Sequence, residues 1–431
     1  MKQLTAILIG AGDRGNGYTL YMNNYPEKFR IVGVAEPIEI RRTIIKDRHC
    51  IPDEACFSDW KDILGKPRMA DFAIIATMDD MHYAPAMKAI ELGYNLLLEK
   101  PVAPTAKECV DIAKAANAKG VSVLVCHVLR YSPFYKTVKS LVKSGIIGEI
   151  QSMLQVEAIG NMHFSNSYIR GNWHSEEESS SMLLAKSCHD IDILQWILER
   201  PCKRVQSFGS LSYFLEKNAP IGAPSRCIDG CPAGNTCPYN SKKYYYDDPE
   251  NIWRKAVTKT TAESETPTNE EVMEALRTTD YGLCVFRANN DVVDRQTVNM
   301  EFENGVTVCF MVNPFNRGGR FIRIFGSKGE LVAYMADEKI SVYTFEDKLY
   351  HEYLVKKTDE SIRGGHGGGD RGIVVDLYDY LNGTYTGDSV ADINVSVSNH
   401  MIVFAAEESR KNGTVVSMDD MFKKYSYKSY T

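Results

Sequence analysis

A short apolar run close to the N-terminus leads directly into a glycine pattern, and this junction restricts the fold more than any other stretch. Residues 6–9 read Ala-Ile-Leu-Ile, and glycines follow at positions 10, 12 and 15. A buried strand that enters a helix through Gly-x-Gly-x-x-Gly is typical of a dinucleotide-binding unit, because the glycines allow a tight turn, admit a pyrophosphate and let helix and strand pack closely. The helix N-terminus offers N–H groups to the phosphates. The predicted phosphate-binding residues are Gly10, Gly12, Asp13, Arg14 and Gly15.

A second apolar run, residues 29–35, ends at Glu36, which lies 21 positions after Gly15. This spacing matches that of the carboxylate that binds the ribose 2′-hydroxyl, and such a carboxylate repels a 2′-phosphate. The pattern therefore favours NAD over NADP, and Arg41 just downstream weakens the preference. The alternative is a chance glycine pattern in an ordinary strand–turn–helix unit, with Glu36 in solvent.

Length and composition set broad limits on the chain. At 431 residues it has room for two domains. A hydrophobic fraction of 44%, a charged fraction of 25% and a formal net charge of −6 give no sign of a nucleic-acid or membrane partner. No apolar stretch approaches the roughly 18–20 residues of a spanning helix. We expect a cytoplasmic location, in which most of the 11 cysteines are reduced thiols.

The order of apolar patterns predicts an α/β protein with two domains. Residues 1–126 alternate strand-like and helix-like segments, which predicts a Rossmann domain: a doubly wound parallel sheet with helices on both faces. Residues 127–431 predict an α+β domain with an open, mostly antiparallel sheet. Alternating strands near 291–345 and closing helices near 371–382 and 391–411 support this. A polar stretch near 215–285 is predicted to be an ordered insertion.

Polar residues lie at or just after the carboxyl ends of the predicted parallel strands, where ligands bind in such sheets. Among them, Lys100 precedes Pro101, which favours an extended backbone at the strand end. This places an amine at the cofactor edge of the sheet, and the alternative is an ordinary surface lysine. The predicted cofactor-binding residues at this edge are Thr77, Asp79, His82, Glu99 and Lys100.

A second candidate group lies at the start of an amphipathic helix near residues 183–199. His189 shares a helix face with Ala185 and Lys186, which precede it by four and three residues. A histidine near a helix N-terminus tends to stay neutral, and a neutral imidazole accepts a proton from a hydroxyl. The alternative is a capping or packed histidine.

Taken together, the glycine turn, Glu99-Lys100-Pro101 and His189-Asp190 resemble the Gfo/Idh/MocA oxidoreductase family. The Gly326–Gly329 turn and the terminal helix that ends near Gly413 fit the same pattern. The resemblance implies that NAD(P) and a sugar-like or polyol substrate meet between the two domains. It further implies that Lys100 polarises the reacting hydroxyl, that His189 is the acid/base and that the chain forms a homodimer or homotetramer.

The sequence departs from the family pattern at two positions. Many members carry an aspartate four residues before the histidine, where this chain has Ala185, and an asparagine two residues before the arginine matched by Arg130, where it has Val128. Lys186 stands beside the first departure. We hypothesise a catalytic role for Lys186, because a second cation near Lys100 lowers a lysine pKa and makes a better base.

Three cysteines fall within 11 positions in a Pro- and Gly-rich stretch, which predicts one bound metal ion. Zinc is the expected ion, since it takes four N/S ligands in structural sites. Cys202 and His174 are weaker candidates for the fourth ligand than Cys284. The alternative is a set of free thiols or a disulfide. The predicted ligands are Cys227, Cys231, Cys237 and Cys284.

A glycine-rich loop at residues 363–370 carries His366 and Asp370 and lacks the strand and lysine of a P-loop. The resemblance implies that it faces the substrate, with both side chains bonding sugar hydroxyls, and the alternative is a flexible hairpin tip. Tyr281, Arg295 and His174 are weaker candidates. The predicted substrate residues are Lys100, Arg130, Trp173, His189 and His366.

Three functions fit these patterns. The leading one is an NAD(P)-dependent oxidoreductase that moves a hydride between nicotinamide and a secondary alcohol of a sugar, polyol or glycoside. The second is a glycosidase or lyase that oxidises the sugar transiently, eliminates a group and recycles its NAD. The third is a non-catalytic NAD-binding sensor, which Ala185 keeps open and which Lys100 and His189 oppose.

Overall fold

A six-stranded parallel sheet forms the N-terminal part of the computed structural model, which describes residues 2–259, 261, 266–355 and 366–430. The strand order is β3-β2-β1-β4-β5-β6, and every pair is parallel. Because the order reverses between β1 and β4, their carboxyl ends form the switch point where ligands bind in such sheets. The strands are β1 (Leu4–Ile9), β2 (Phe29–Ala35), β3 (Cys56–Phe57), β4 (Phe72–Ile75), β5 (Asn95–Leu98) and β6 (Val123–Val125).

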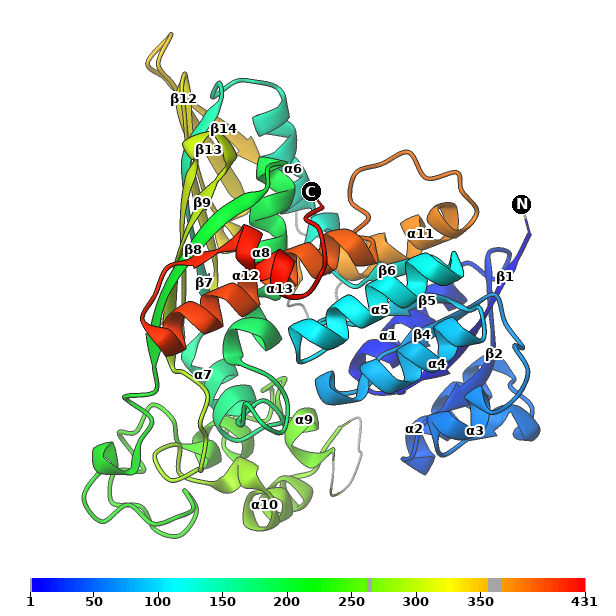
Figure 1. Cartoon of the computed structure of the whole chain (residues 1–431). Coiled ribbons are helices and arrows are strands. Elements are labelled where there is room, and N and C mark those ends of the chain that lie inside the picture. The colour runs from blue at the N-terminus through cyan, green and yellow to red at the C-terminus, as the bar shows by residue number, and fades with distance from the viewer. Residues whose placement is uncertain (1, 260, 262–265, 356–365, 431) are drawn as a thin grey trace.

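Helices connect these strands, as the alternating pattern predicts, so the Rossmann prediction is confirmed (Figure 1). Local signals set their ends. The longest of them begins where the Thr105 hydroxyl accepts a hydrogen bond from the Glu108 amide, and it ends at Gly120 in the left-handed conformation. The helices are α1 (Asp13–Asn23), α2 (Glu39–His49), α3 (Trp60–Leu64), α4 (Tyr83–Glu91) and α5 (Ala106–Lys119).

The rest of the chain is built on a nine-stranded sheet, whose strands follow the order β14-β13-β12-β11-β7-β10-β9-β8-β15. Only the β7–β10 pair is parallel among these described strands, which confirms the open, mostly antiparallel sheet. The strands are β7 (Ile150–Ala158), β8 (Cys202–Ser210), β9 (Arg295–Phe302), β10 (Thr307–Asn313), β11 (Gly319–Gly326), β12 (Gly329–Tyr334), β13 (Lys339–Thr344), β14 (Tyr350–Leu354) and β15 (Val416–Ser417).

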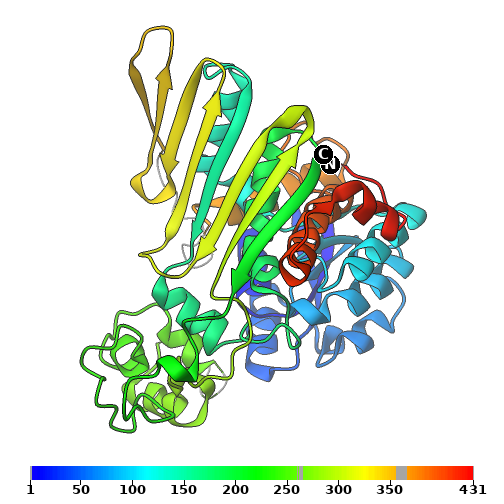
Figure 2. The same ribbon diagram turned by 60° about the vertical axis from the view of Figure 1, so that its left-hand side comes forward.

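Helices cover one face of this sheet and separate it from the parallel sheet, and the other face carries no helix in either view (Figures 1 and 2). Helix α8 begins at Met182, where the Ser181 hydroxyl caps the Leu184 amide. The described α-helices after residue 126, not all of which lie on this sheet, are α6 (Pro133–Lys143), α7 (Asn161–Phe164), α8 (Met182–Leu198), α9 (Arg254–Thr258), α10 (Asn269–Thr278), α11 (Gly369–Leu381), α12 (Ile393–Asn412) and α13 (Met418–Lys424). In the described ranges, no helix combines the length and apolar character needed to cross a membrane.

Helix α11 returns to the parallel sheet. Its apolar face, Ile373, Val374 and Leu377, belongs to the same buried cluster as Phe29 and Phe72 of β2 and β4. Strand β6 ends at Val125 and β7 begins at Ile150, so the chain passes from one sheet to the other between them. Residues 366–368 directly precede α11, and His366 lies beside Arg14 at the switch point of the first domain.

The described residues between β8 and β9, which include the stretch predicted to be an insertion, lie below the large sheet in Figure 1. A small apolar core holds α9 and α10 together, and the capping box of Thr268 and Glu271 begins α10. The members of this core include Tyr245, Val257, Val272, Ala275 and Leu276.

Candidate active site

The glycine turn after β1 has the geometry that a dinucleotide needs. Gly10 has φ +88°, and a Cβ there would lie 2.6 Å from the Ala76 carbonyl oxygen. A Cβ at Gly15 would lie 2.0 Å from the Gly10 carbonyl oxygen. At Gly12 a Cβ would meet nothing within 4 Å, so this position faces open space. The first and third glycines are therefore required by the protein itself, and the second leaves room for a ligand, which fits a pyrophosphate.

Glu36 lies beside this turn at the end of β2. Its carboxylate accepts hydrogen bonds from the Ala11 amide at 2.7 Å and the Ile38 amide at 3.0 Å, and the side chain is buried. Arg41, the other residue predicted to influence cofactor choice, lies in the first turn of α2. The arrangement holds a carboxylate at the position predicted to meet the ribose.

The two polar residues within the glycine pattern make contacts that their sequence positions do not reveal. Arg14 donates from Nε to Glu99 at 2.7 Å and from Nη2 to Asp370 at 2.8 Å. Asp13 pairs with Lys259 of the insertion at 2.5 Å. The Arg14 guanidinium therefore joins the glycine turn to α11, and these contacts do not favour the predicted role of Arg14 at the phosphates.

Three further predicted cofactor residues hold neighbouring loops in place. Thr77 donates to the Met81 carbonyl oxygen at 3.2 Å, and the His82 ring bridges the Pro101 and Thr77 carbonyl oxygens at 2.7 and 3.2 Å. Asp79 accepts hydrogen bonds across the domain boundary, from the Trp173 indole at 3.2 Å and the Ser180 hydroxyl at 2.9 Å. The predicted substrate residue Trp173 thus has its indole N–H committed to Asp79.

Lys100 meets the start of α8 at the position where the family's aspartate is replaced. Its ammonium donates to the Ala185 carbonyl oxygen at 2.8 Å, and its own amide donates to Glu99 at 3.0 Å. A backbone carbonyl therefore fixes the amine in place of a carboxylate. The structure thus brings Lys100 of the Rossmann domain onto the helix that carries His189.

His189 is buried in the middle of α8, and neither ring nitrogen has a hydrogen-bond partner among the described residues. The predicted cause of its neutrality, a nearby helix N-terminus, is wrong because α8 already begins at Met182. Burial instead lowers the pKa of His189 well below its ordinary value, and the charges of Lys100 and His366 act in the same direction. This environment favours the neutral form of the His189 ring.

His366 joins this group from the loop before α11, and its ring centroid lies 5.4 Å from that of His189. Its Nδ1 lies 3.2 Å from Asp370. Burial alone would raise the pKa of Asp370, but His366 and Arg14 hold it well below its ordinary value. The predicted neighbours 363–365 lie outside the described residues.

A buried charge network beneath α8 was missed from the sequence. Arg320 on β11 donates to Asp190 of α8 at 2.9 Å and contacts Glu157, its register partner on β7. Gln155 also donates to Asp190, at 2.7 Å. The available signal was the presence of charged residues at inward-facing positions of otherwise apolar strands.

Lys186 lies beside this network, 3.8 Å from the nearest Glu157 oxygen. Burial lowers the pKa of Lys186, Glu157 opposes this effect, and Arg320 and Lys100 reinforce it. The charges of Lys186 and Lys100 therefore interact, as the sequence hypothesis requires. The influence of Lys186 on catalysis stays a prediction.

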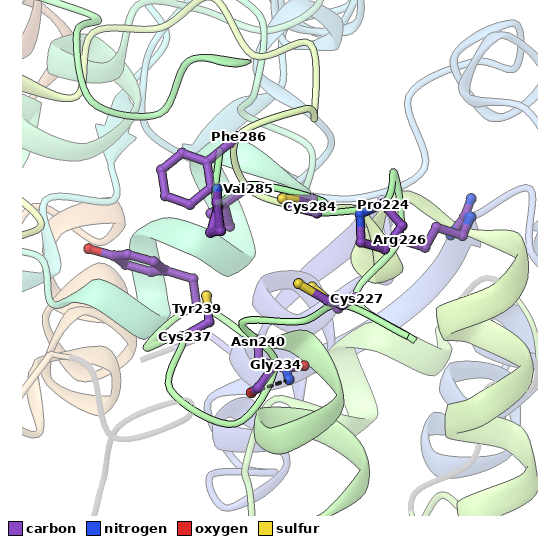
Figure 3. A pocket seen from close by; sticks show the side chains of 13 residues that line it. Pro224, Arg226, Cys227, Gly234, Cys237, Tyr239, Asn240, Cys284, Val285 and Phe286 are labelled. Atoms are coloured by element: carbon purple, nitrogen blue, oxygen red, sulfur yellow. Dashed lines mark hydrogen bonds between the residues drawn. The ribbon is translucent and has the colours of Figure 1, made fainter. Parts of the chain in front are cut away.

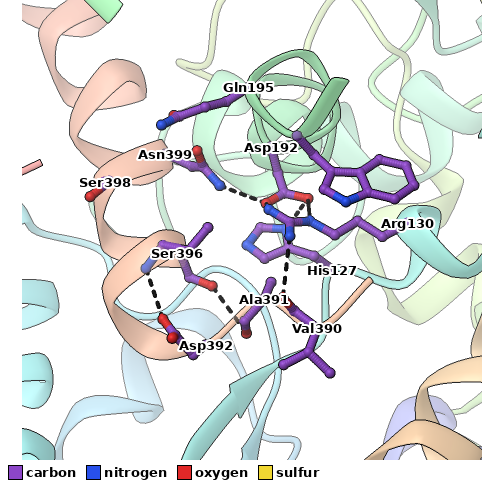
Figure 4. Close-up of polar contacts among 12 residues, drawn as sticks. His127, Arg130, Asp192, Gln195, Val390, Ala391, Asp392, Ser396, Ser398 and Asn399 are labelled. Carbon is purple, nitrogen blue, oxygen red and sulfur yellow. Dashed lines mark hydrogen bonds and ion pairs between the residues drawn. The ribbon is translucent and has the colours of Figure 1, made fainter. Parts of the chain in front are cut away.

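Arg130 lies in a different environment from the one predicted (Figure 4). Its guanidinium makes a bidentate pair with Asp192 at 2.7 and 2.6 Å, and Asn399 donates to the same carboxylate at 2.6 Å. His127 lies 3.7 Å from Asp192. These groups are buried, so Arg130 stabilises the packing of α8 against α12, and its contacts do not favour a substrate role.

The four predicted metal ligands line one small cavity in the insertion, as Figure 3 shows for Cys227, Cys237 and Cys284. Nevertheless, no group of three His, Cys, Asp or Glu side chains in the described ranges is arranged to hold a metal ion. The Cys227 thiol lies 3.8 Å from the Leu283 carbonyl oxygen and 3.7 Å from Arg170, and burial raises the pKa of Cys237 and Cys284. The arrangement of these side chains in the described ranges therefore does not support the zinc prediction.

The weaker candidates lie apart from Lys100 and His189. Arg295 pairs with Asp294 at the start of β9, and His174 contacts the Gly171 carbonyl oxygen at 3.1 Å. Tyr281 packs against Tyr245 in the core of the insertion, and Cys202 begins β8.

The glycine turn, the strand-end lysine and the buried histidine define a two-domain oxidoreductase with a Rossmann cofactor domain. The chain matches the profile of the Gfo/Idh/MocA oxidoreductase family with an NAD-binding Rossmann fold over residues 4–127. It matches the C-terminal alpha/beta domain of the same family over residues 139–418. The chain belongs to this family.

Individual relatives agree with this assignment. YteT of Bacillus subtilis is 23% identical over 83% of this chain and 84% of its own length. The 2,7-anhydro-N-acetylneuraminate hydratase of Escherichia coli is 28% identical over 44% of this chain and 48% of its own length. The structure of a levoglucosan dehydrogenase in complex with NADH and L-sorbose superposes with a TM-score of 0.68 at 18% identity, covering 97% of this chain and 99% of the other.

Proposed function

We propose that this protein oxidises a secondary alcohol of a sugar, polyol or glycoside with NAD, or catalyses the reverse reduction. One observation carries the proposal. The Lys100 ammonium donates to the Ala185 carbonyl on α8, and the same helix carries the buried His189, whose ring nitrogens have no hydrogen-bond partner among the described residues. Both groups belong to the elements that meet the carboxyl edge of the parallel sheet, where a nicotinamide ring would lie.

The chain's residues divide the work of dehydrogenation. When bound, NAD accepts a hydride at C4 of its nicotinamide. Lys100 donates a hydrogen bond to the reacting hydroxyl oxygen and stabilises the negative charge that develops there. His189 accepts the hydroxyl proton at a ring nitrogen, which its neutral state leaves available. His366, beside His189, bonds a further substrate hydroxyl.

NAD is the proposed cofactor in preference to NADP. The Glu36 carboxylate is fixed by the Ala11 and Ile38 amides beside the glycine turn. A 2′-phosphate at that position would meet a negative charge that these amides prevent from moving away.

A screen of sugars, polyols and glycosides tests the proposal when NADH and product are followed together. The expected result is NADH formation in stoichiometric amount with an oxidised sugar. A His189→Ala variant that turned over at the wild-type rate would remove the acid/base assignment.

The NAD-recycling glycosidase or lyase is the second candidate. One relative is named a hydratase, and hydration involves no net oxidation or reduction. This name supports the second candidate. Cleavage of a glycoside with no net NADH in the same screen would establish it. The sensor alternative requires NAD binding without turnover of any compound.

We also propose that the chain forms a homodimer or homotetramer through the open face of the nine-stranded sheet. Large apolar side chains are exposed on its strands, including Phe208 at 59%, Tyr350 at 65% and Leu354 at 82%. Light scattering of the purified protein tests this, and a monomer at micromolar concentration would contradict it.

A further inference from the structure

The ammonium of Lys186 lacks the partners that the neighbouring cations have. Within the described residues it makes no hydrogen bond, and its nearest carboxylate oxygen, on Glu157, lies 3.8 Å away. The side chain is only 16% exposed. The side chain is mostly buried, and the long ion pair with Glu157 leaves the three N–H donors of the ammonium available to an anionic ligand.

Two nearby cations have closer partners in the protein. Lys100 donates to the Ala185 carbonyl oxygen at 2.8 Å. Arg320 donates to Asp190 at 2.9 Å and contacts Glu157. Lys186 is therefore the cation of this group with the weakest contact to the described part of the protein.

Glu157 is a poor partner for Lys186 because the fold commits it elsewhere. Its register on β7 places it directly opposite Arg320 of β11. Burial raises the pKa of Glu157, although Arg320 and Lys186 act against the rise. The Glu157 carboxylate therefore pairs with the Arg320 guanidinium, and its burial disfavours the charged form.

Lys186 and Lys100 meet at the same turn of α8. The carbonyl group that accepts the Lys100 hydrogen bond belongs to Ala185, the residue before Lys186. The charge of Lys100 also contributes to the lowered pKa of Lys186, so the two amines lie close enough for their charges to interact. A sugar whose reacting hydroxyl is held by Lys100 can then reach Lys186 with another substituent.

We propose that Lys186 binds a carboxylate on the substrate, so that the protein acts on acidic sugars of the uronic acid type in preference to neutral ones. This inference rests on the proposed oxidoreductase function and narrows its substrate class. A carboxylate fits better than a phosphate, because one ammonium balances one negative charge, while Lys100 is assigned to the reacting hydroxyl and Arg320 is paired with Asp190 and Glu157.

The test compares sugars that differ only in the acid group. The kcat/KM for NAD reduction is measured with D-glucuronate against D-glucose and with D-galacturonate against D-galactose, free and as methyl glycosides. For at least one pair we expect the acid to be favoured by about thirtyfold or more, mostly through KM. A preference for the neutral member of every pair, or for glucose 6-phosphate over glucuronate, would overturn the inference.

Variants locate the effect. Lys186→Met should lower the acid-to-neutral ratio of kcat/KM at least thirtyfold, and Lys186→Arg should restore most of it. Lys119→Met, on an exposed lysine at the end of α5, is the matched control and should leave the ratio unchanged. An unchanged ratio in Lys186→Met would contradict the inference and leave the oxidoreductase proposal intact.

Calorimetric titration of the same uronates into the NADH-loaded protein separates the two proposals. If no sugar is turned over but a uronate binds in a Lys186-dependent manner, the oxidoreductase proposal fails and carboxylate recognition stands. If no uronate binds to a protein that does oxidise neutral sugars, carboxylate recognition fails alone.

Discussion

The guanidinium of Arg14 and the carboxylate of Asp370 form a 2.8 Å ion pair between residues 356 positions apart in the chain. Arg14 lies in the glycine turn, and Asp370 lies in the first turn of α11. The pair therefore fixes the cofactor turn to the loop that carries His366. Glu99, the residue before Lys100, is the second carboxylate of the same guanidinium.

Replacing Arg14 with methionine is expected to destabilise the fold by about 3 kcal/mol, because it leaves the buried Glu99 and Asp370 carboxylates without their cation. Urea unfolding at pH 7 measures the loss. Arg14→Lys keeps a positive charge and should lose less than half as much. Equal stability of the methionine variant and the wild type would show that the pair contributes nothing.

The glycines of the turn should separate folding from cofactor binding. Gly10→Ala forces a Cβ against the Ala76 carbonyl at φ +88° and should destabilise the protein by about 2 kcal/mol. At Gly12 an added Cβ meets nothing within 4 Å, so the Tm of Gly12→Val should stay close to that of the wild type while NAD affinity falls at least tenfold. Thermal unfolding and NADH fluorescence titration measure the two effects. Full NAD affinity in Gly12→Val would exclude this turn as the cofactor site.

The charge of Glu36 should set the choice between NAD and NADP. Glu36→Gln keeps an acceptor for the Ala11 amide and removes the negative charge. The ratio of kcat/KM for NAD to that for NADP should fall about tenfold, which corresponds to about 1.4 kcal/mol. Glu39→Gln, at the first residue of α2, is the matched control. A ratio that changes equally in both variants would place the ribose elsewhere.

Local sequence patterns were sufficient to predict most of the fold. The runs that became β1, β4 and β5 and the helix α5 alternate with clear end signals, so their periodicity was readable without knowledge of their partners. Strand β8 was missed because Lys203, Arg204 and Gln206 interrupt its apolar positions, and its pairing with the distant strands β9 and β15 stabilises it.

Site residues that belong to a short sequence motif could be predicted. Site residues that meet only through the tertiary fold could not. Lys100 and His189 follow from motifs within a few residues of each. Glu157 and Arg320 meet only because β7 pairs with β11, and no local pattern encodes that register. Arg14 has a phosphate-binding position in the sequence, but Asp370 lies far away in the chain and takes its guanidinium.

The pH dependence of oxidation should report the environment of His189. Because burial lowers its pKa well below the ordinary value of about 6.5, the ring stays neutral and able to accept a proton at pH values where an exposed histidine is charged. The rate of sugar oxidation should therefore show no loss from His189 protonation near pH 6.5. It should fall tenfold per pH unit only below the lowered pKa.

Variants at two histidines test this assignment. His189→Gln removes the base and should lower kcat by about 10²–10⁴-fold while abolishing the acid limb of the profile. His351→Gln, on the exposed strand β14, should keep both the rate and the limb, because His351 pairs only with Asp347 among the described residues. An acid limb that persists in His189→Gln would belong to another group. In that case His366, whose ring lies beside His189, is the residue to replace next.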